Sequence, residues 1–182
     1  MAETYRQAWM QVGISQDMID KRRLPLFTEA FELETAEVSS GGREFRLTPA
    51  AADAWKRMKT AASRSGVDIH IVSAHRSVQR QVELIAAKLD AGQALEAVLE
   101  VLAPPGCSEH HTGRAVDIGT GNVKPLEPEF ESTPAFCWLR SNALDYGFEL
   151  SFPEDNEFGY VYEPWHWCFS ERVAQQIVAA DV

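Results

Sequence analysis

The chain has 182 residues, of which 45% are hydrophobic and 24% are charged, and its formal net charge is −10. This length suits one domain, and the composition is typical of a globular protein and not of a disordered one. The acidic balance argues against nucleic acid as a partner, because phosphates attract surfaces rich in Lys and Arg. No apolar run approaches the roughly 18 residues that a membrane helix needs, so membrane insertion is not expected.

The cysteines and the first residues bear on the compartment. Cys107, Cys137 and Cys168 show no CxxC spacing, which argues against a zinc knuckle and a dithiol redox motif. An odd number of cysteines without a dense framework is typical of a reducing compartment. Residues 1–7 are polar and lack the apolar segment of a signal peptide. We therefore expect a cytoplasmic chain, unless a leader was removed from it; the oligomeric state is left open.

The N-terminal quarter of the chain is weakly patterned. Its apolar residues gather in two short pieces, at residues 24–27 and 31–33. We expect a single domain over residues 1–182, in which residues 1–47 wrap a catalytic core formed by residues 48–182.

The first clear helix begins at Thr48 and Pro49. Thr can cap the free N–H groups of a helix, and Pro fits the first helical position. The pattern predicts a helix that runs to about Ser65 and ends at Gly66. The residues that recur at helical spacing are Ala51, Ala54, Trp55, Met58 and Ala62.

The middle of the chain alternates between strand and helix signals. Residues 68–73 are mostly β-branched and predict a short strand. Ser77 can cap a second helix, and a further helix is expected over residues 94–102. The second helix carries its apolar face on Val78, Val82, Ile85 and Leu89.

The C-terminal third of the chain is expected to add further helices and strands. We predict a strand at residues 114–118, a helix at 134–146 and a strand at 159–169 that includes Pro164. Ser170 is expected to cap a last helix through Val178. Because helices and strands alternate without a βαβ rhythm or a glycine fingerprint, we expect an α+β fold, with a small antiparallel sheet that carries the site and helices that flank it.

Four of the five histidines lie in three short segments, at residues 73–77, 108–117 and 163–167. Together these segments supply two imidazoles and a carboxylate that can bind a divalent metal. They also supply a second carboxylate that can act as a general base and an arginine that can stabilise a developing oxyanion. A catalytic zinc ion takes three such ligands and leaves one position open for water. A nearby carboxylate can then take the proton of that water. The HExxH motif of helical zinc peptidases is absent.

Two of these segments carry a family resemblance. The pattern Ser-x-His-x-x-Gly-x-Ala-x-Asp at residues 108–117, followed by Glu-Pro-Trp-His-Trp at 163–167, resembles the VanY-type D-alanyl-D-alanine carboxypeptidases. Their superfamily also holds VanX-type D,D-dipeptidases, phage L-alanyl-D-glutamate endopeptidases and the hedgehog signalling domain. The resemblance extends from about Leu47 to Val178.

The resemblance implies a role for individual residues. It makes His110, Asp117 and His166 the ligands of one zinc ion. It makes Glu163 the base that deprotonates the water and then protonates the leaving amine. Arg76 aligns with the arginine that orients the substrate carbonyl and stabilises the oxyanion, a charge-assisted contact.

Further positions follow from the same resemblance. Ser108, Gln81 and Tyr162 lie where the family contacts its substrate. The spacing to Gly113 selects His110 as the ligand over its neighbour His111, which is expected either behind the ligands or facing solvent. Glu163 and His166 are an odd number of residues apart, so Pro164 is expected to introduce an irregularity that turns both toward the metal.

The chain departs from the family pattern near the expected pocket. His75 replaces a tyrosine, Ser151-Phe152-Pro153 replaces a segment that is often Arg-Tyr-Pro, and Cys168 replaces an arginine. These changes affect recognition of the substrate's C-terminal carboxylate and leave the expected zinc ligands and base untouched. Cys168 is expected to serve packing, as is at least one of Trp165 and Trp167.

The sequence thus predicts a zinc metallopeptidase that hydrolyses the terminal D-alanyl-D-alanine bond of peptidoglycan stem peptides or their precursors. One alternative keeps the chemistry but changes the substrate, as in a D,D-dipeptidase or an L-alanyl-D-glutamate endopeptidase. Another is a zinc-bearing binding module without turnover. Glu163 and Arg76 favour an enzyme, because a module that only binds needs neither a base nor an oxyanion donor.

Overall fold

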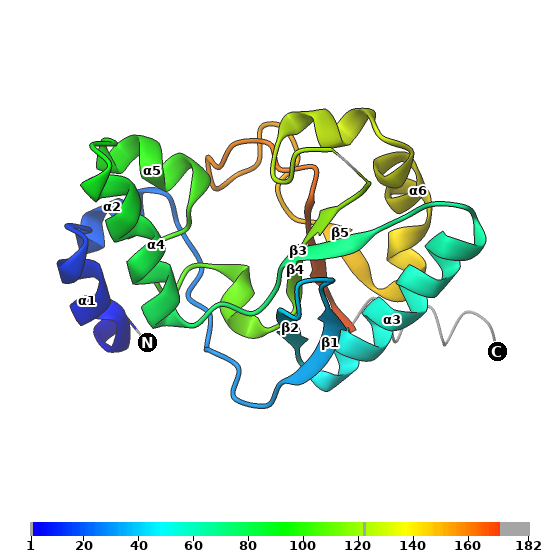
Figure 1. Ribbon diagram of the computed structural model, residues 1–182. Coiled ribbons are helices and arrows are strands. Elements are labelled where there is room, and N and C mark those ends of the chain that lie inside the picture. The colour runs from blue at the N-terminus through cyan, green and yellow to red at the C-terminus, as the bar shows by residue number, and fades with distance from the viewer. Residues whose placement is uncertain (1, 122, 172–182) are drawn as a thin grey trace.

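The computed structural model describes residues 2–121 and 123–171 (Figure 1). Its centre is a four-stranded antiparallel sheet in the order β3-β4-β6-β5. The chain forms this sheet from strands that are far apart in sequence, so the sheet connects the middle of the chain to its C-terminal part. The strands are β3 (His70–Ser73), β4 (Ala115–Gly119), β5 (Phe148–Leu150) and β6 (His166–Phe169).

A hairpin and a long helix cover one side of this sheet. The hairpin strands β1 (Glu34–Val38) and β2 (Glu44–Leu47) pair antiparallel and pack against α3 (Pro49–Arg64). The five apolar positions predicted for α3 are all fully buried, because they form one stripe that faces the sheet. At the edge of this core, Trp55 donates a hydrogen bond from Nε1 to Glu37 at 2.9 Å.

A second group of helices lies on the opposite side of the strands, where Figure 1 shows α1, α2, α4 and α5 together. They have their own apolar cluster, in which Trp9, Val82 and Ile85 are buried. Ser77 caps α4 by accepting a hydrogen bond from the amide of Arg80, as the sequence predicted. The helices are α1 (Ala2–Gln11), α2 (Gln16–Lys21), α4 (Val78–Asp90) and α5 (Leu95–Val101).

The remaining elements border the sheet. Helix α6 (Pro134–Asn142) continues into the short 3-10 helix η3 (Ala143–Tyr146), and β5 follows directly. Two further 3-10 helices are η1 (Glu109–Thr112) and η2 (Pro128–Ser132). In the described residues, no helix is both long and apolar enough to cross a membrane.

Most predicted elements are confirmed, and the fold is α+β with a small antiparallel sheet flanked by helices. Thr48 is the N-cap residue of α3, as predicted. Its side chain does not form the expected capping hydrogen bond, because the hydroxyl is buried without a hydrogen-bond partner. The strand expected over 159–169 is also wrong in its first half, because regular pairing begins only at His166. Pro164 lacks an amide donor and cannot extend that ladder.

Several elements were not predicted. Helices α1 and α2 and strands β1 and β2 lie in the N-terminal segment, whose short apolar pieces have no sustained period. Strand β5 has only three residues, too few for alternation to identify it. The helix predicted after Ser170 falls almost entirely on residues 172–182, which lie outside the described residues.

Candidate active site

Strand register brings the three histidine-containing segments together. Asp117 on β4 pairs with His166 on β6, and on its other side Asp117 pairs with Ser73 of β3. Residues opposite each other on antiparallel strands project toward the same face of the sheet. The Asp117 and His166 side chains therefore share one face, and the segment that leaves β3 after Ser73 enters at the same place.

His110 reaches this face from the short helix η1, which precedes β4. Gly113 ends that helix with a left-handed φ of 65°, and a Cβ built there would lie 2.7 Å from a Leu33 methyl group. The His110 Nδ1 atom lies 2.7 Å from the Ala74 carbonyl oxygen. Because a carbonyl only accepts, Nδ1 must carry the ring proton, which leaves Nε2 free as a metal ligand.

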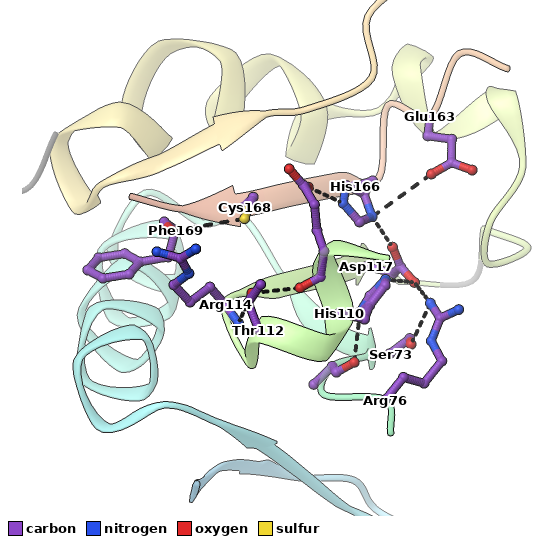
Figure 2. A network of polar contacts seen from close by, with 12 residues as sticks. Ser73, Arg76, His110, Thr112, Arg114, Asp117, Glu163, His166, Cys168 and Phe169 are labelled. Carbon is purple, nitrogen blue, oxygen red and sulfur yellow. Dashed lines mark hydrogen bonds and ion pairs between the residues drawn. The ribbon is translucent and has the colours of Figure 1, made fainter. Parts of the chain in front are cut away.

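The three predicted ligands form one buried cluster, as Figure 2 shows. One donor atom from each of His110, Asp117 and His166 lies within 4.8 Å of the other two. His110 Nε2 is 3.2 Å from Asp117 Oδ2, and His166 Nδ1 is 3.0 Å from Asp117 Oδ1. Tetrahedral zinc with bonds of about 2.0 Å places its ligands roughly 3.3 Å apart. The donor set and its spacing therefore fit a single zinc ion.

The charge of the cluster also suits a cation. Burial would lower the pKa of His166, but hydrogen bonds to Asp117 and Glu109 outweigh it and raise the pKa to about 10. A positive charge at Nδ1 is thus stabilised, and a divalent cation can supply it in place of the proton. Burial and the charge of Arg76 lower the pKa of His110 to about 4, so that this imidazole is neutral and ready to bind a metal.

Glu163 lies beside the cluster, in the turn before β6. The amide of His166 donates to the Glu163 carbonyl at 3.0 Å, and the Glu163 amide donates to Phe152 at 3.1 Å. This turn is the irregularity expected around Pro164, and it places Glu163 Oε2 3.9 Å from His166 Nδ1 (Figure 2). Burial raises the pKa of Glu163 to about 7, and the charges of His166 and Arg76 only partly offset that effect. A carboxyl with such a pKa can both accept and return a proton near neutrality.

Arg76 faces the cluster from the side opposite Glu163 (Figure 2). Its Nη2 atom lies 3.4 Å from Asp117 Oδ2 and 3.4 Å from the Ser73 hydroxyl, while Nη1 donates to Gln81 at 3.2 Å. The Nε atom is buried without a hydrogen-bond partner. Arg76 lines the cleft, and the positive charge of its guanidinium is suited to stabilising an oxyanion.

The cleft in front of the cluster has a volume of about 810 Å³. Ser108 and Tyr162, both predicted substrate contacts, line it. Gln81 has a different place, since its side chain is fully buried and is not among the lining residues. It donates to the Ala103 carbonyl at 2.7 Å and accepts from Arg76, so it holds the arginine in place.

His111 stands behind the cluster, and the solvent-facing alternative for it is wrong. The side chain is fully buried, with Nδ1 donating to the Arg76 carbonyl at 2.7 Å and Nε2 accepting from the Gly106 amide at 3.0 Å. These bonds tie the arginine segment to the loop before η1. Trp167 packs in the main apolar cluster, whereas Trp165 also lines the cleft.

Glu109, which precedes the candidate ligand His110, has a contact that its position in the sequence did not predict. Its Oε2 atom accepts a hydrogen bond from His166 Nε2 at 2.9 Å. This contact joins η1 to β6, although Glu109 and His166 are 57 positions apart in sequence. An acidic residue beside a histidine is common by chance, so only the tertiary contact distinguishes this one.

A known protein family covers the residues of this site. The family model described as "VanY: D-alanyl-D-alanine carboxypeptidase" matches residues 44–172. The chain belongs to the VanY D-alanyl-D-alanine carboxypeptidase family. The matched range contains the cluster, Glu163 and Arg76, and it begins after the N-terminal helices α1 and α2.

Two curated sequences are similar to most of this chain. The putative carboxypeptidase YodJ of Bacillus subtilis is 37% identical over 131 residues, which is 70% of this chain but 48% of that protein. The bifunctional D-Ala-D-Ala dipeptidase and carboxypeptidase VanXYC of Enterococcus gallinarum is 31% identical over 140 residues, covering 74% of this chain and 73% of that protein. The chain thus spans about half the length of the first relative.

Solved structures share the fold of this VanY family member. The LdcB LD-carboxypeptidase is 33% identical with a TM-score of 0.71, covering 87% of this chain and 77% of its own. A VanY D,D-pentapeptidase mutant in complex with Zn(II) is 25% identical with a TM-score of 0.62, covering 87% of this chain and 94% of its own. The zinc complex of that relative agrees with the metal that the donor set here fits.

Proposed function

We propose that this chain is a zinc-dependent carboxypeptidase that hydrolyses the terminal D-alanyl-D-alanine bond of peptidoglycan stem peptides or their precursors. One observation carries the proposal: Glu163, with a pKa of about 7, lies 3.9 Å from a donor of the buried cluster formed by His110, Asp117 and His166. Membership of the VanY family and the names of the relatives support the substrate class.

A zinc ion held by His110 Nε2, Asp117 and His166 Nδ1 would supply Lewis acidity, which makes water more acidic and polarises a carbonyl group. Glu163 takes a proton from the attacking water at its carboxylate while the water oxygen bonds to the carbonyl carbon of the substrate. The C–N bond then breaks, and Glu163 returns the proton to the leaving amine. A pKa near 7 lets one carboxyl serve both steps.

Arg76 has the second role in this proposal. The carbonyl oxygen becomes an anion as water adds, and a preorganised donor on that oxygen stabilises the charge. The guanidinium is already fixed by Asp117, Ser73 and Gln81, so it loses little freedom when substrate binds. This positions a permanent positive charge on the side of the cluster away from Glu163.

The cleft volume bears on substrate length. About 810 Å³ is in the range that holds ligands of drug size, well above the needs of a free dipeptide. The cleft therefore favours a carboxypeptidase acting on longer peptides over a strict D,D-dipeptidase. A second candidate is removal of a single terminal D-alanine after an L-residue, which the likeness to the LdcB LD-carboxypeptidase favours.

The test is to incubate the zinc-loaded protein separately with a stem pentapeptide, a stem tetrapeptide and free D-Ala-D-Ala, and to measure the D-alanine released. We expect release from the pentapeptide and much less from the dipeptide. Release from the tetrapeptide alone would favour the second candidate. If no peptide is hydrolysed while zinc is bound, the enzymatic proposal is wrong and a module that only binds remains.

A further inference from the structure

The segment between β5 and β6, residues 151–165, forms part of the cleft without helix or strand structure of its own. It presents Phe152, Tyr160 and Tyr162 to the cleft and carries Glu163 near its C-terminal end. In Figure 1 this orange segment reaches from the sheet toward α5. Loops of this kind open at low free energy unless contacts hold them, so the wall they form depends on their anchors.

The tip of this segment is closed by one side chain of its own. Asn156 accepts a hydrogen bond from the Tyr160 amide at 3.2 Å and donates to the carbonyls of Tyr160 and Pro153 at 2.8 and 3.1 Å. These bonds make residues 153–160 a compact turn. They do not attach that turn to the rest of the protein.

Arg22 provides the attachment from the end of α2. Its Nε atom donates to the Phe158 carbonyl at 2.8 Å, and its Nη1 atom donates to the Leu99 carbonyl of α5 at 2.7 Å. The guanidinium also lies over the Tyr160 ring, 4.5 Å from its centre. One half-buried side chain thus joins α2, α5 and the cleft segment.

The joint is reinforced beside Arg22. The Val161 amide donates to the Glu100 carbonyl at 3.0 Å, and Phe158 and Tyr160 pack against the apolar cluster of the N-terminal helices. Arg22 lies outside the range that the family model matches, residues 44–172. The N-terminal segment, expected only to wrap the core, therefore supplies a contact that shapes the cleft.

We propose that Arg22 is a positioning residue that docks residues 153–161 on the N-terminal helices and so forms the Tyr160–Tyr162 wall of the substrate cleft. Glu163 does not depend on this anchor, because its own amide is bonded to Phe152 and its carbonyl to His166. Loss of Arg22 should loosen the wall and leave the base in place. The consequence for substrate rests on the proposed function, whereas the docking itself does not.

Amide hydrogen exchange tests the docking without any substrate. In Arg22→Ala, peptides covering residues 153–161 should exchange about 10-fold faster or more, because the charged hydrogen bond to Phe158 and the contact with the Tyr160 ring are lost together with the link to Leu99. In Arg22→Lys, the exchange rate of these peptides should lie between those of the unmodified protein and Arg22→Ala, since an ammonium group cannot make both hydrogen bonds in a fixed fork. Lys21→Ala, at the exposed neighbour on α2, is the matched control and should not change. Unchanged exchange in Arg22→Ala, or acceleration spread evenly over the sheet, would overturn the proposal.

Kinetics on the stem peptide that is cleaved give the second readout. Arg22→Ala should raise KM about fivefold or more with kcat within about twofold, because binding weakens while the reacting groups stay in place. A fall in kcat at unchanged KM would contradict the assignment to the wall. If no peptide is cleaved, the proposed function fails and the exchange result alone decides the role of Arg22.

Discussion

Glu109 accepts a hydrogen bond from Nε2 of His166 at 2.9 Å, which leaves Nδ1 of that imidazole facing Asp117. A carboxylate that holds the second nitrogen of a ligand histidine fixes its tautomer and orientation and increases its basicity. The same bond connects η1, which carries His110, to β6. Glu109 thus orients one proposed ligand while it is the chain neighbour of another.

The first prediction concerns zinc affinity. Glu109→Gln should weaken zinc binding roughly 10-fold and Glu109→Ala up to about 100-fold, because His166 loses its acceptor. Affinity is measured by competition with a chromophoric chelator at fixed pH. Glu149→Gln is the control, since this exposed carboxylate lies on β5 outside the cleft, and Asp117→Ala should lose zinc most completely. Equal affinity in Glu109→Ala and the unmodified protein would remove Glu109 from this role.

The second prediction separates the base from the ligands. Glu163→Gln keeps the size of the side chain but cannot take a proton, so kcat should fall about 10²- to 10⁴-fold. Zinc content should stay near one ion per chain, because the residue is not in the donor cluster. Steady-state kinetics and elemental analysis on one preparation check both parts. Activity within a few-fold of the unmodified enzyme would show that another group takes the proton.

The third prediction concerns pH. Burial raises the pKa of Glu163 to about 7, and the base works only as a carboxylate, so activity must be lost as pH falls through that pKa. A bound zinc ion favours the ionised form, which places the acid limb of kcat/KM at or below pH 7. Below it, kcat/KM should fall about tenfold per pH unit. Zinc content measured at each pH distinguishes this limb from ligand protonation, and a limb that persists in the residual activity of Glu163→Gln would exclude Glu163 as its origin.

The fourth prediction concerns Arg76 and its support. Arg76→Ala should lower kcat/KM about 10²- to 10³-fold through loss of the oxyanion donor. Gln81→Leu should cost roughly tenfold, since it removes one hydrogen bond that orients the guanidinium. Because Gln81 acts through Arg76, the double variant should be no worse than Arg76→Ala. Additive losses would instead mean that Gln81 acts separately.

Much of the candidate site could be predicted because chemistry and spacing are local properties of a sequence. The family resemblance of residues 108–117 and 163–167 implied His110, Asp117 and His166 as ligands, and the fold brings their donor atoms within 4.8 Å of one another. The apolar stripe of α3 and the cap at Ser77 were equally predictable, since one helical period or one side chain determines each. Roles that depend mainly on the chemistry of a residue within a local motif could therefore be predicted with little knowledge of the tertiary structure.

Other features of the site depend on contacts between segments that are far apart in sequence. The register that pairs Asp117 with His166 and the hydrogen bond of Glu109 both depend on how β4 and β6 align. The reassignment of Gln81 from substrate to Arg76 follows from its complete burial. Burial depends on everything packed around a residue, and no short pattern encodes it.

The sequence by itself indicated metal-binding chemistry, because it supplies two imidazoles and a carboxylate in segments that resemble a family of zinc peptidases. The tertiary structure alone decided which nitrogen of each histidine is free, which carboxylate supports His166, and that Arg22 of the N-terminal segment anchors a wall of the cleft. The physical reason is that hydrogen-bond partners and pKa values depend on contacts between residues far apart in sequence, which only the folded chain creates.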